Sequence, residues 1–154
     1  MPSRDAVRSF ERRMSLHRYF LNADYLRDVF MRRLAAQQGV PATDADDLDN
    51  QSAMLLWYAA LYVVIEGWKE LDLSDSEVDG FLSDDRTDKL RVFRNKVFHY
   101  QKEYSPNGLV AFLEADGPDG SSSAEWVRGT HFALGRAIVR SIEETNPTYP
   151  EPRA

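Results

Sequence analysis

The sequence predicts an all-α protein, a single-domain bundle of about five helices that spans residues 1–145. Apolar residues recur at spacings of three and four along three long segments, which is the period of an amphipathic helix. Two Ser-x-x-Glu capping boxes precede helical segments, and Gly and Pro gather between the segments, where helices end. With 154 residues, 43% of them apolar, the chain is long enough to bury one hydrophobic core.

The first two predicted helices are the longest. Residues 3–38 carry one apolar stripe and end at Gly39. An acidic loop follows, and we expect the second helix to run from about Asn50 to Leu71. Its stretch 53–65 is apolar on all sides, so this helix must be central in the bundle or partly covered by a subunit interface.

The third and fourth predicted helices are shorter. A Ser-Asp-Ser-Glu capping box at residues 74–77 opens the third helix. Asp84 or Asp85 then caps the fourth, which we expect to run to Tyr100 or Gln101.

The C-terminal third is less regular. Residues 103–122 contain five Gly and Pro residues, and the apolar segment 109–113 within them fits either a short helix or an extended segment. The second capping box, formed by Ser122 and Glu125, opens the last helix. Residues 146–154 contain three prolines, cannot continue that helix and are predicted to form a mobile tail.

The composition excludes several classes of function. A net charge of −6 argues against a general nucleic-acid coat protein, although residues 1–38 carry eight arginines against four acidic residues. Without cysteine there is no disulfide, thiolate metal site or cysteine nucleophile. His17 and His131 stand alone in the sequence and are predicted to be structural, and neither a metal nor a cofactor is expected.

The chain shows no targeting or membrane signal. Its longest apolar run, residues 53–65, has 13 residues, whereas a membrane span needs about 18–20. No apolar segment of the kind found in secretion signals follows Met1. We therefore expect a cytoplasmic protein that makes no membrane contact.

The fourth helix carries the most concentrated set of reactive side chains. Because a helix turns 100° per residue, Leu90, Phe93, Val97 and Tyr100 share a stripe that should face the core. The opposite face collects the cationic and polar residues Arg91, Arg94, Asn95 and His99, together with the apolar Phe98. A large apolar side chain among these groups predicts a covered face, and a second copy of the chain can cover it across a two-fold axis. We therefore predict a homodimer with Phe98 in the interface.

Arg94 and His99 are the two groups that could cleave RNA without a metal. Imidazole transfers protons near neutrality, and a guanidinium stays cationic and matches a pair of phosphate oxygens. Asn95 lies four residues before His99 and can orient its ring, while Arg91 can contact substrate. Glu66, at the end of the apolar run in the second helix, is a further candidate, although its position also fits a simple exit from the core.

The run Arg-Asn-Lys-Val-Phe-His at residues 94–99 resembles the Arg-x4–6-His motif of HEPN domains. These all-α domains commonly dimerise, and many are metal-independent ribonucleases with a composite site between two motif helices. The polar residue after the arginine, here Asn95, belongs to the same pattern. The resemblance implies RNA or a nucleotide in an inter-subunit cleft, products with 2′,3′-cyclic phosphate ends, and a toxin or defence role with an antitoxin or nucleotidyltransferase partner.

The motif departs from one branch of the family, and a second function stays open. Toxin members carry a tyrosine two residues after the histidine, where a nucleotidyltransferase modifies it; here that residue is Gln101, with Tyr100 and Tyr104 nearby. Since the helical layout puts Tyr100 in the core, such regulation is not expected.

The family also has non-catalytic members, so the alternative is a helical module that binds a nucleotide or a partner protein. Arg94 and His99 could then be a structural pair.

Overall fold

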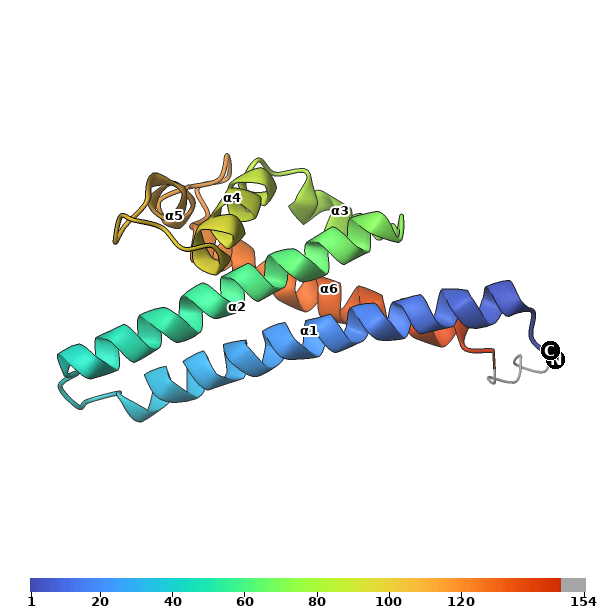
Figure 1. Cartoon of the computed structure of the whole chain (residues 1–154), viewed down its shortest axis with the longest axis horizontal. Helices are drawn as coiled ribbons and strands as arrows, with labels where there is room; N and C mark the ends of the chain where they lie inside the picture. The colour runs from blue at the N-terminus through green and yellow to red at the C-terminus, as the bar shows by residue number, and fades with distance from the viewer. Residues whose placement is uncertain (148–154) are drawn as a thin grey trace.

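The computed structural model describes residues 1–147, which are almost entirely helical (Figure 1). Within these residues there are six helices and no strand: α1 (Arg4–Ala36), α2 (Asp44–Glu70), α3 (Ser76–Leu82), α4 (Arg86–Phe98), α5 (Asn107–Leu113) and α6 (Ser123–Thr145). The all-α class is confirmed, and α5 is the additional helix, in the segment where sequence left the choice open. Residues 148–154, most of the predicted mobile tail, lie outside the described residues.

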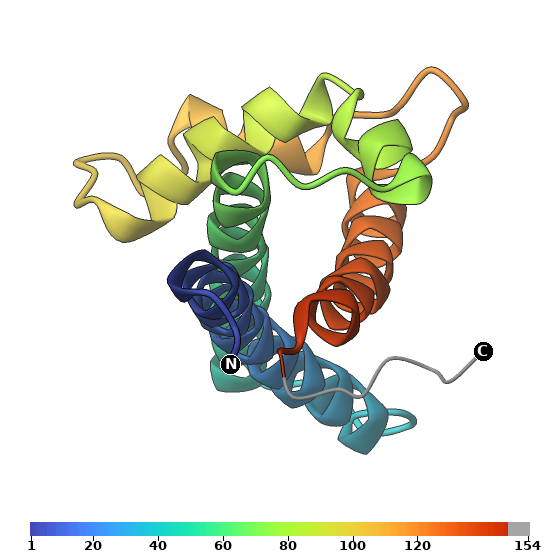
Figure 2. The same cartoon turned by 90° about the vertical axis from the view of Figure 1, so that its right-hand side faces the viewer.

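The helices form two levels: α1, α2 and α6 make up the first, and α3, α4 and α5 make up the second (Figure 2). α1 and α2 run antiparallel and side by side (Figure 1), and α6 packs against α1. In Figure 2, α3, α4 and α5 lie across the ends of α2 and α6, on the side away from α1. No helix within residues 1–147 is long and apolar enough to span a membrane.

The second helix is central, as one of the two sequence alternatives required. It contacts α1, α4 and α6, and it contributes more buried residues than α1 or α4. Its buried residues are Ala53, Trp57, Tyr58, Ala59, Leu61, Tyr62, Val64, Ile65 and Trp68. Burial of its aromatic and branched side chains contributes to the apolar stabilisation of the bundle.

Two helix starts differ from the prediction. α2 begins at Asp44 rather than near Asn50, because Thr43 accepts the Asp46 N–H (3.2 Å) and the Asp46 carboxylate accepts the Thr43 N–H (3.0 Å). At α3 the cap is Asp75 rather than the preceding serine, since the Asp75 carboxylate accepts two N–H groups of the first turn. A carboxylate is the stronger acceptor for the positive end of the helix dipole.

The fourth helix ends at Phe98, before the predicted Tyr100 or Gln101. His99 is extended, with φ −109° and ψ 135°. Its carbonyl accepts a hydrogen bond from the Gln101 side-chain N–H (3.0 Å), and Gln101 in turn accepts one from the Lys96 ammonium (3.2 Å). The prediction that Tyr100 faces the core is therefore wrong: its side chain is 92% exposed, because the 100° rule stops where the helix stops.

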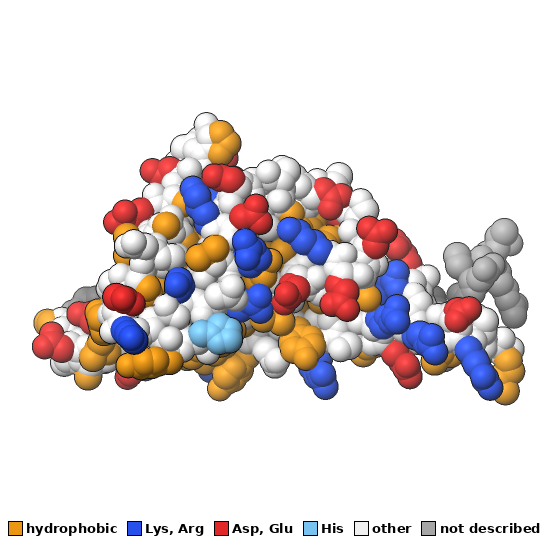
Figure 3. All heavy atoms as spheres, turned by 45° about the horizontal axis from the view of Figure 1, so that its top comes forward, with side chains coloured by type: hydrophobic (Ala, Val, Ile, Leu, Met, Phe, Trp, Pro, Cys, Tyr) orange, Lys and Arg blue, Asp and Glu red, His pale blue; other side chains and the backbone are white. Residues whose placement is uncertain are grey.

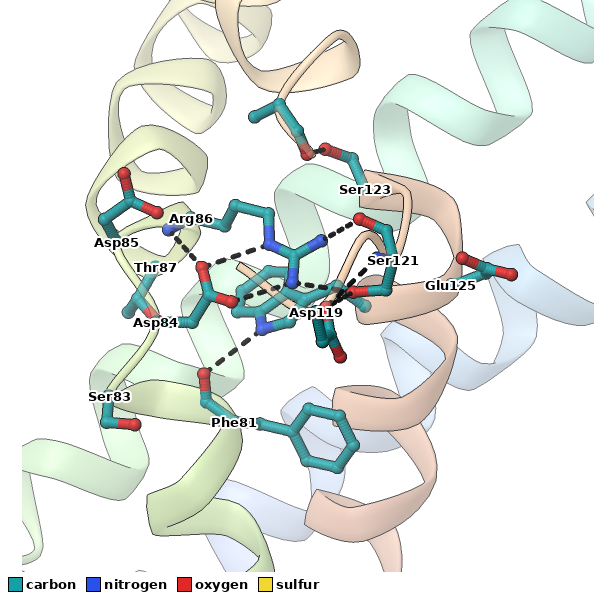
Figure 4. A network of polar contacts seen from close by, with 12 residues as sticks. Phe81, Ser83, Asp84, Asp85, Arg86, Thr87, Asp119, Ser121, Ser123 and Glu125 are labelled. Atoms are coloured by element: carbon teal, nitrogen blue, oxygen red, sulfur yellow. Dashed lines mark hydrogen bonds and ion pairs between the residues drawn. The ribbon is translucent and has the colours of Figure 1, made fainter. Parts of the chain in front are cut away.

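A buried arginine fixes the start of α4 (Figure 4). The Arg86 guanidinium donates to both Asp84 carboxylate oxygens (3.0 and 2.7 Å) and to the carbonyls of Ser121 and Ser122 (2.9 and 3.1 Å). These bonds tie the segment before α6 to the beginning of α4. Hydrogen bonding to Arg86 also holds the pKa of Asp84 below 3.8.

A buried histidine joins three helices. His131 on α6 is fully buried; its Nδ1 lies 3.1 Å from Trp57 Nε1 on α2, and its Nε2 lies 2.9 Å from Asp24 Oδ1 on α1. Indole nitrogen only donates, so Nδ1 accepts and Nε2 carries the proton that Asp24 accepts. Burial lowers the pKa of His131. These contacts agree with the structural role predicted for this residue.

Candidate functional site

Arg94 reaches α2 rather than projecting straight into solvent. It follows Phe93 by 100° on α4, so its aliphatic stem starts at the edge of the buried stripe. Its Nη1 lies 3.4 Å from Glu66 Oε2, and its guanidinium carbon lies 5.1 Å from the centre of the Tyr62 ring. The side chain is only 23% exposed, which corrects the placement of Arg94 on a face opposite the core.

Glu66 and Tyr62 lie one turn apart on α2 and form the other half of this cluster. Glu66 was a candidate in the sequence, and the structure brings it to Arg94. Tyr62 lies within the apolar run 53–65, which the sequence indicates only as covered, although its spacing of four from Glu66 indicates a shared face. Burial, together with the nearby Glu66 charge, raises the pKa of Tyr62.

Arg94 keeps donors for a further acceptor. A guanidinium has five N–H donors, and the contact with Glu66 uses one of them. The Arg94 Nε–H is buried and has no hydrogen-bond partner within the described part of the chain. A half-exposed ion pair of this kind is worth about 0–1 kcal/mol, so it positions Arg94 without closing the group to an anion.

His99 lies just beyond the end of α4 with its side chain exposed. Its backbone N–H donates to the Asn95 carbonyl (3.0 Å), which closes the last turn of the helix. Among the described residues no hydrogen bond joins the Asn95 amide to the His99 ring. The predicted contact between these side chains required helical geometry at both residues, and His99 is extended.

The other two candidates remain on the surface near this cluster. Arg91 is exposed, and its charge lowers the pKa of Tyr62, opposing the larger effect of burial. Phe98 is 51% exposed, as expected of an apolar residue on the motif face. Figure 3 shows this side of the molecule, where basic side chains are interspersed with hydrophobic and acidic ones.

Within residues 1–147, no three His, Asp or Glu side chains lie together in a way that could hold a metal ion. Comparisons of the chain with protein-family models, with curated proteins and with solved structures found no match. Arg94, His99 and their neighbours are therefore the residues from which we infer a function.

Proposed function

We propose that the protein is a metal-independent endoribonuclease of the HEPN type that acts as a homodimer. The observation that carries the proposal is the arrangement at the end of α4, where a half-buried, positioned Arg94 precedes an exposed His99 by five residues. Arginine held in place by a carboxylate and an aromatic ring is preorganised for a phosphate. The accessible imidazole of His99, just beyond the end of the same helix, can move protons near neutral pH.

The proposed reaction is a transesterification within the RNA. His99 accepts the proton of a ribose 2′-hydroxyl, and the 2′-oxygen attacks the adjacent phosphorus. The bond from phosphorus to the 5′-oxygen breaks, and that oxygen leaves as an alcohol after it takes up a proton. Arg94 stabilises the negative charge on the phosphorane oxygens. A homodimer holds two copies of His99, which can serve as base and acid.

The exposed end of α4 favours self-association. Phe98, 51% exposed, and the still more exposed Tyr100 are large apolar or aromatic groups next to charged residues. A two-fold axis buries such a patch against itself, and this would bring two motifs together.

The exposure of Tyr100 and Tyr104 removes the geometric reason against modification by a nucleotidyltransferase. A toxin or defence role remains part of the proposal.

Cleavage of RNA by purified protein in excess EDTA tests the proposal. The parent should yield fragments with 2′,3′-cyclic phosphate ends, and His99→Ala and Arg94→Ala should each lose at least about a hundredfold in rate. Arg94→Lys should recover only part, because an ammonium lacks the planar fork of the guanidinium. His17→Ala is the matched control and should cleave normally.

Thermal melting of the same variants separates chemistry from folding. His99 is exposed, so its removal should change stability by less than about 0.5 kcal/mol. Unchanged cleavage by folded His99→Ala, or cleavage that EDTA stops and magnesium restores, would refute the mechanism.

The second candidate function is a non-catalytic module that binds a nucleotide or a partner protein at the same surface. The Arg94–Glu66 ion pair favours it, since such a pair can orient a binding arginine without chemistry. This function predicts no cleavage by the parent, together with nucleotide or protein binding that Arg94→Ala abolishes.

A further inference from the structure

A groove of about 420 Å³ lies between α1 and α2, next to the candidate site. Leu16 and Val63 are among its apolar lining residues. Gly67 also lines it and brings the two helices close together there: a Cβ on this residue would lie 2.7 Å from Leu16 Cδ1. The volume falls within the range of small-molecule sites, about 300–1,000 Å³.

Glu66 belongs to both the groove and the motif cluster. It lines the groove from α2, and its carboxylate lies 3.4 Å from Arg94. A ligand in the groove would therefore lie beside the arginine that the proposed function assigns to the scissile phosphate.

The charges around the groove favour a nucleotide over a simple cation. Arg12 lines the groove from α1, and residues 4–18 carry five arginines against two acidic residues. Such a basic stretch attracts a nucleic-acid backbone. The charged lining residues are Arg12, Glu66 and Glu70, and Glu66 is paired with Arg94 beside the groove, so one carboxylate and one guanidinium remain to meet a ligand.

Tyr19 supplies an aromatic face for a planar ligand. It lines the groove and is 43% exposed. Stacking on an aromatic side chain is the usual way in which proteins hold an unpaired base.

The carboxylates select among the four bases by hydrogen bonding. A carboxylate only accepts, and guanine presents two adjacent donors, N1–H and N2–H, on its Watson–Crick edge. Adenine and cytosine present one donor beside an acceptor, and uracil presents one donor between two acceptors. Because Glu66 is engaged by Arg94, Glu70 is the available group; it is exposed and has no hydrogen bond or ion pair among the described residues.

We propose that this groove binds a guanine base of single-stranded RNA, with Glu70 accepting its N1–H and N2–H and Tyr19 stacking on its ring. The inference rests on the proposed function for its substrate class and adds a base preference next to the cleaved bond.

Calorimetric titration of the full chain with the four ribonucleoside 5′-monophosphates tests this proposal without any cleavage. Guanosine monophosphate should bind about 10- to 100-fold more tightly than the other three, the discrimination expected of one bidentate pair. Glu70→Gln should lose this preference and shift it toward adenosine monophosphate, because an amide offers one donor and one acceptor. Tyr19→Ala should weaken all four. Glu114→Gln, an exposed glutamate at the end of α5, is the control.

The outcomes separate this proposal from the ribonuclease proposal. Equal binding of all four nucleotides, no binding of any, or an unchanged preference in folded Glu70→Gln would overturn the groove assignment. Guanine-selective binding without RNA cleavage would support the groove and refute the ribonuclease. Cleavage with no preference for guanine beside the cut would support the ribonuclease proposal and refute the groove assignment.

Discussion

Replacement of Arg86 by alanine should be among the most damaging single changes in the bundle. The guanidinium is buried, carries bonds to Asp84, Ser121 and Ser122, and lies 5.6 Å from the centre of the Trp126 ring (Figure 4). Its removal leaves the Asp84 carboxylate, 13% exposed, without its cationic partner. Breaking one side of a buried ion pair costs about 3–5 kcal/mol. For a chain of this size that lowers the melting temperature by roughly 6–20 °C.

A surface arginine gives the matched control. Arg136 pairs with Glu77 at 2.6 Å, but both side chains are at least half exposed. Arg136→Ala should therefore cost about 0–1 kcal/mol. The difference between the two variants measures the effect of burial on an ion pair of the same type.

The cost of Arg86→Ala should also depend on pH. Arg86 holds the folded pKa of Asp84 below 3.8, so this pair contributes stability above that pH and loses it as pH falls through the folded pKa. The gap between parent and Arg86→Ala should thus be largest above about pH 4 and shrink below it. Urea unfolding followed by circular dichroism from pH 3 to pH 7 measures it. A loss no larger than that of Arg136→Ala at pH 7 would refute the reasoning.

Three further predictions follow from other contacts. Gly117→Ala should destabilise the protein by about 1–3 kcal/mol in urea unfolding, because its Cβ would lie 2.8 Å from the guanidinium carbon of the immobilised Arg86; a neutral change would contradict this. Light scattering should give about twice the 17.7 kDa chain mass, and Phe98→Asp should give a monomer; a monomeric parent would rule out the dimer. Burial lowers the pKa of His131 below 6.5, so the unfolded chain binds more protons below that pH, and the free energy of unfolding should fall from pH 7 to pH 5. His131→Gln should lack this fall, and equal slopes in both proteins would show that the histidine is not its source.

The helical segments were predictable because their causes are local. The apolar spacing of residues 3–38 led to α1 at Arg4–Ala36, and the box formed by Ser122 and Glu125 marks the start of α6 as expected. Periodicity and capping depend on residues within one or two turns. The Arg-x4-His spacing of residues 94–99 is equally local and was visible without a structure.

The geometry of the motif depended on contacts that no local pattern encodes. Gln101 and the extended backbone of His99 end α4, so the angular layout failed for His99 and Tyr100. Sequence could nominate Glu66 but not its partner, since 28 residues separate it from Arg94.

The buried polar contacts also join residues that are far apart in the sequence, so no local pattern could predict them. His131 meets Asp24 across 107 positions and Trp57 across 74, and Arg86 reaches the Ser121 carbonyl across 35. Burial of a polar group without a partner costs about 1–3 kcal/mol, which favours the packing that pairs Arg86 and His131. The amino-acid sequence by itself determined the long helical segments and nominated the candidate side chains, but it left residues 109–113 undecided. Only the packing of distant helices decided which of those side chains meet, because burial, not sequence distance, sets the cost of leaving a polar group unpaired.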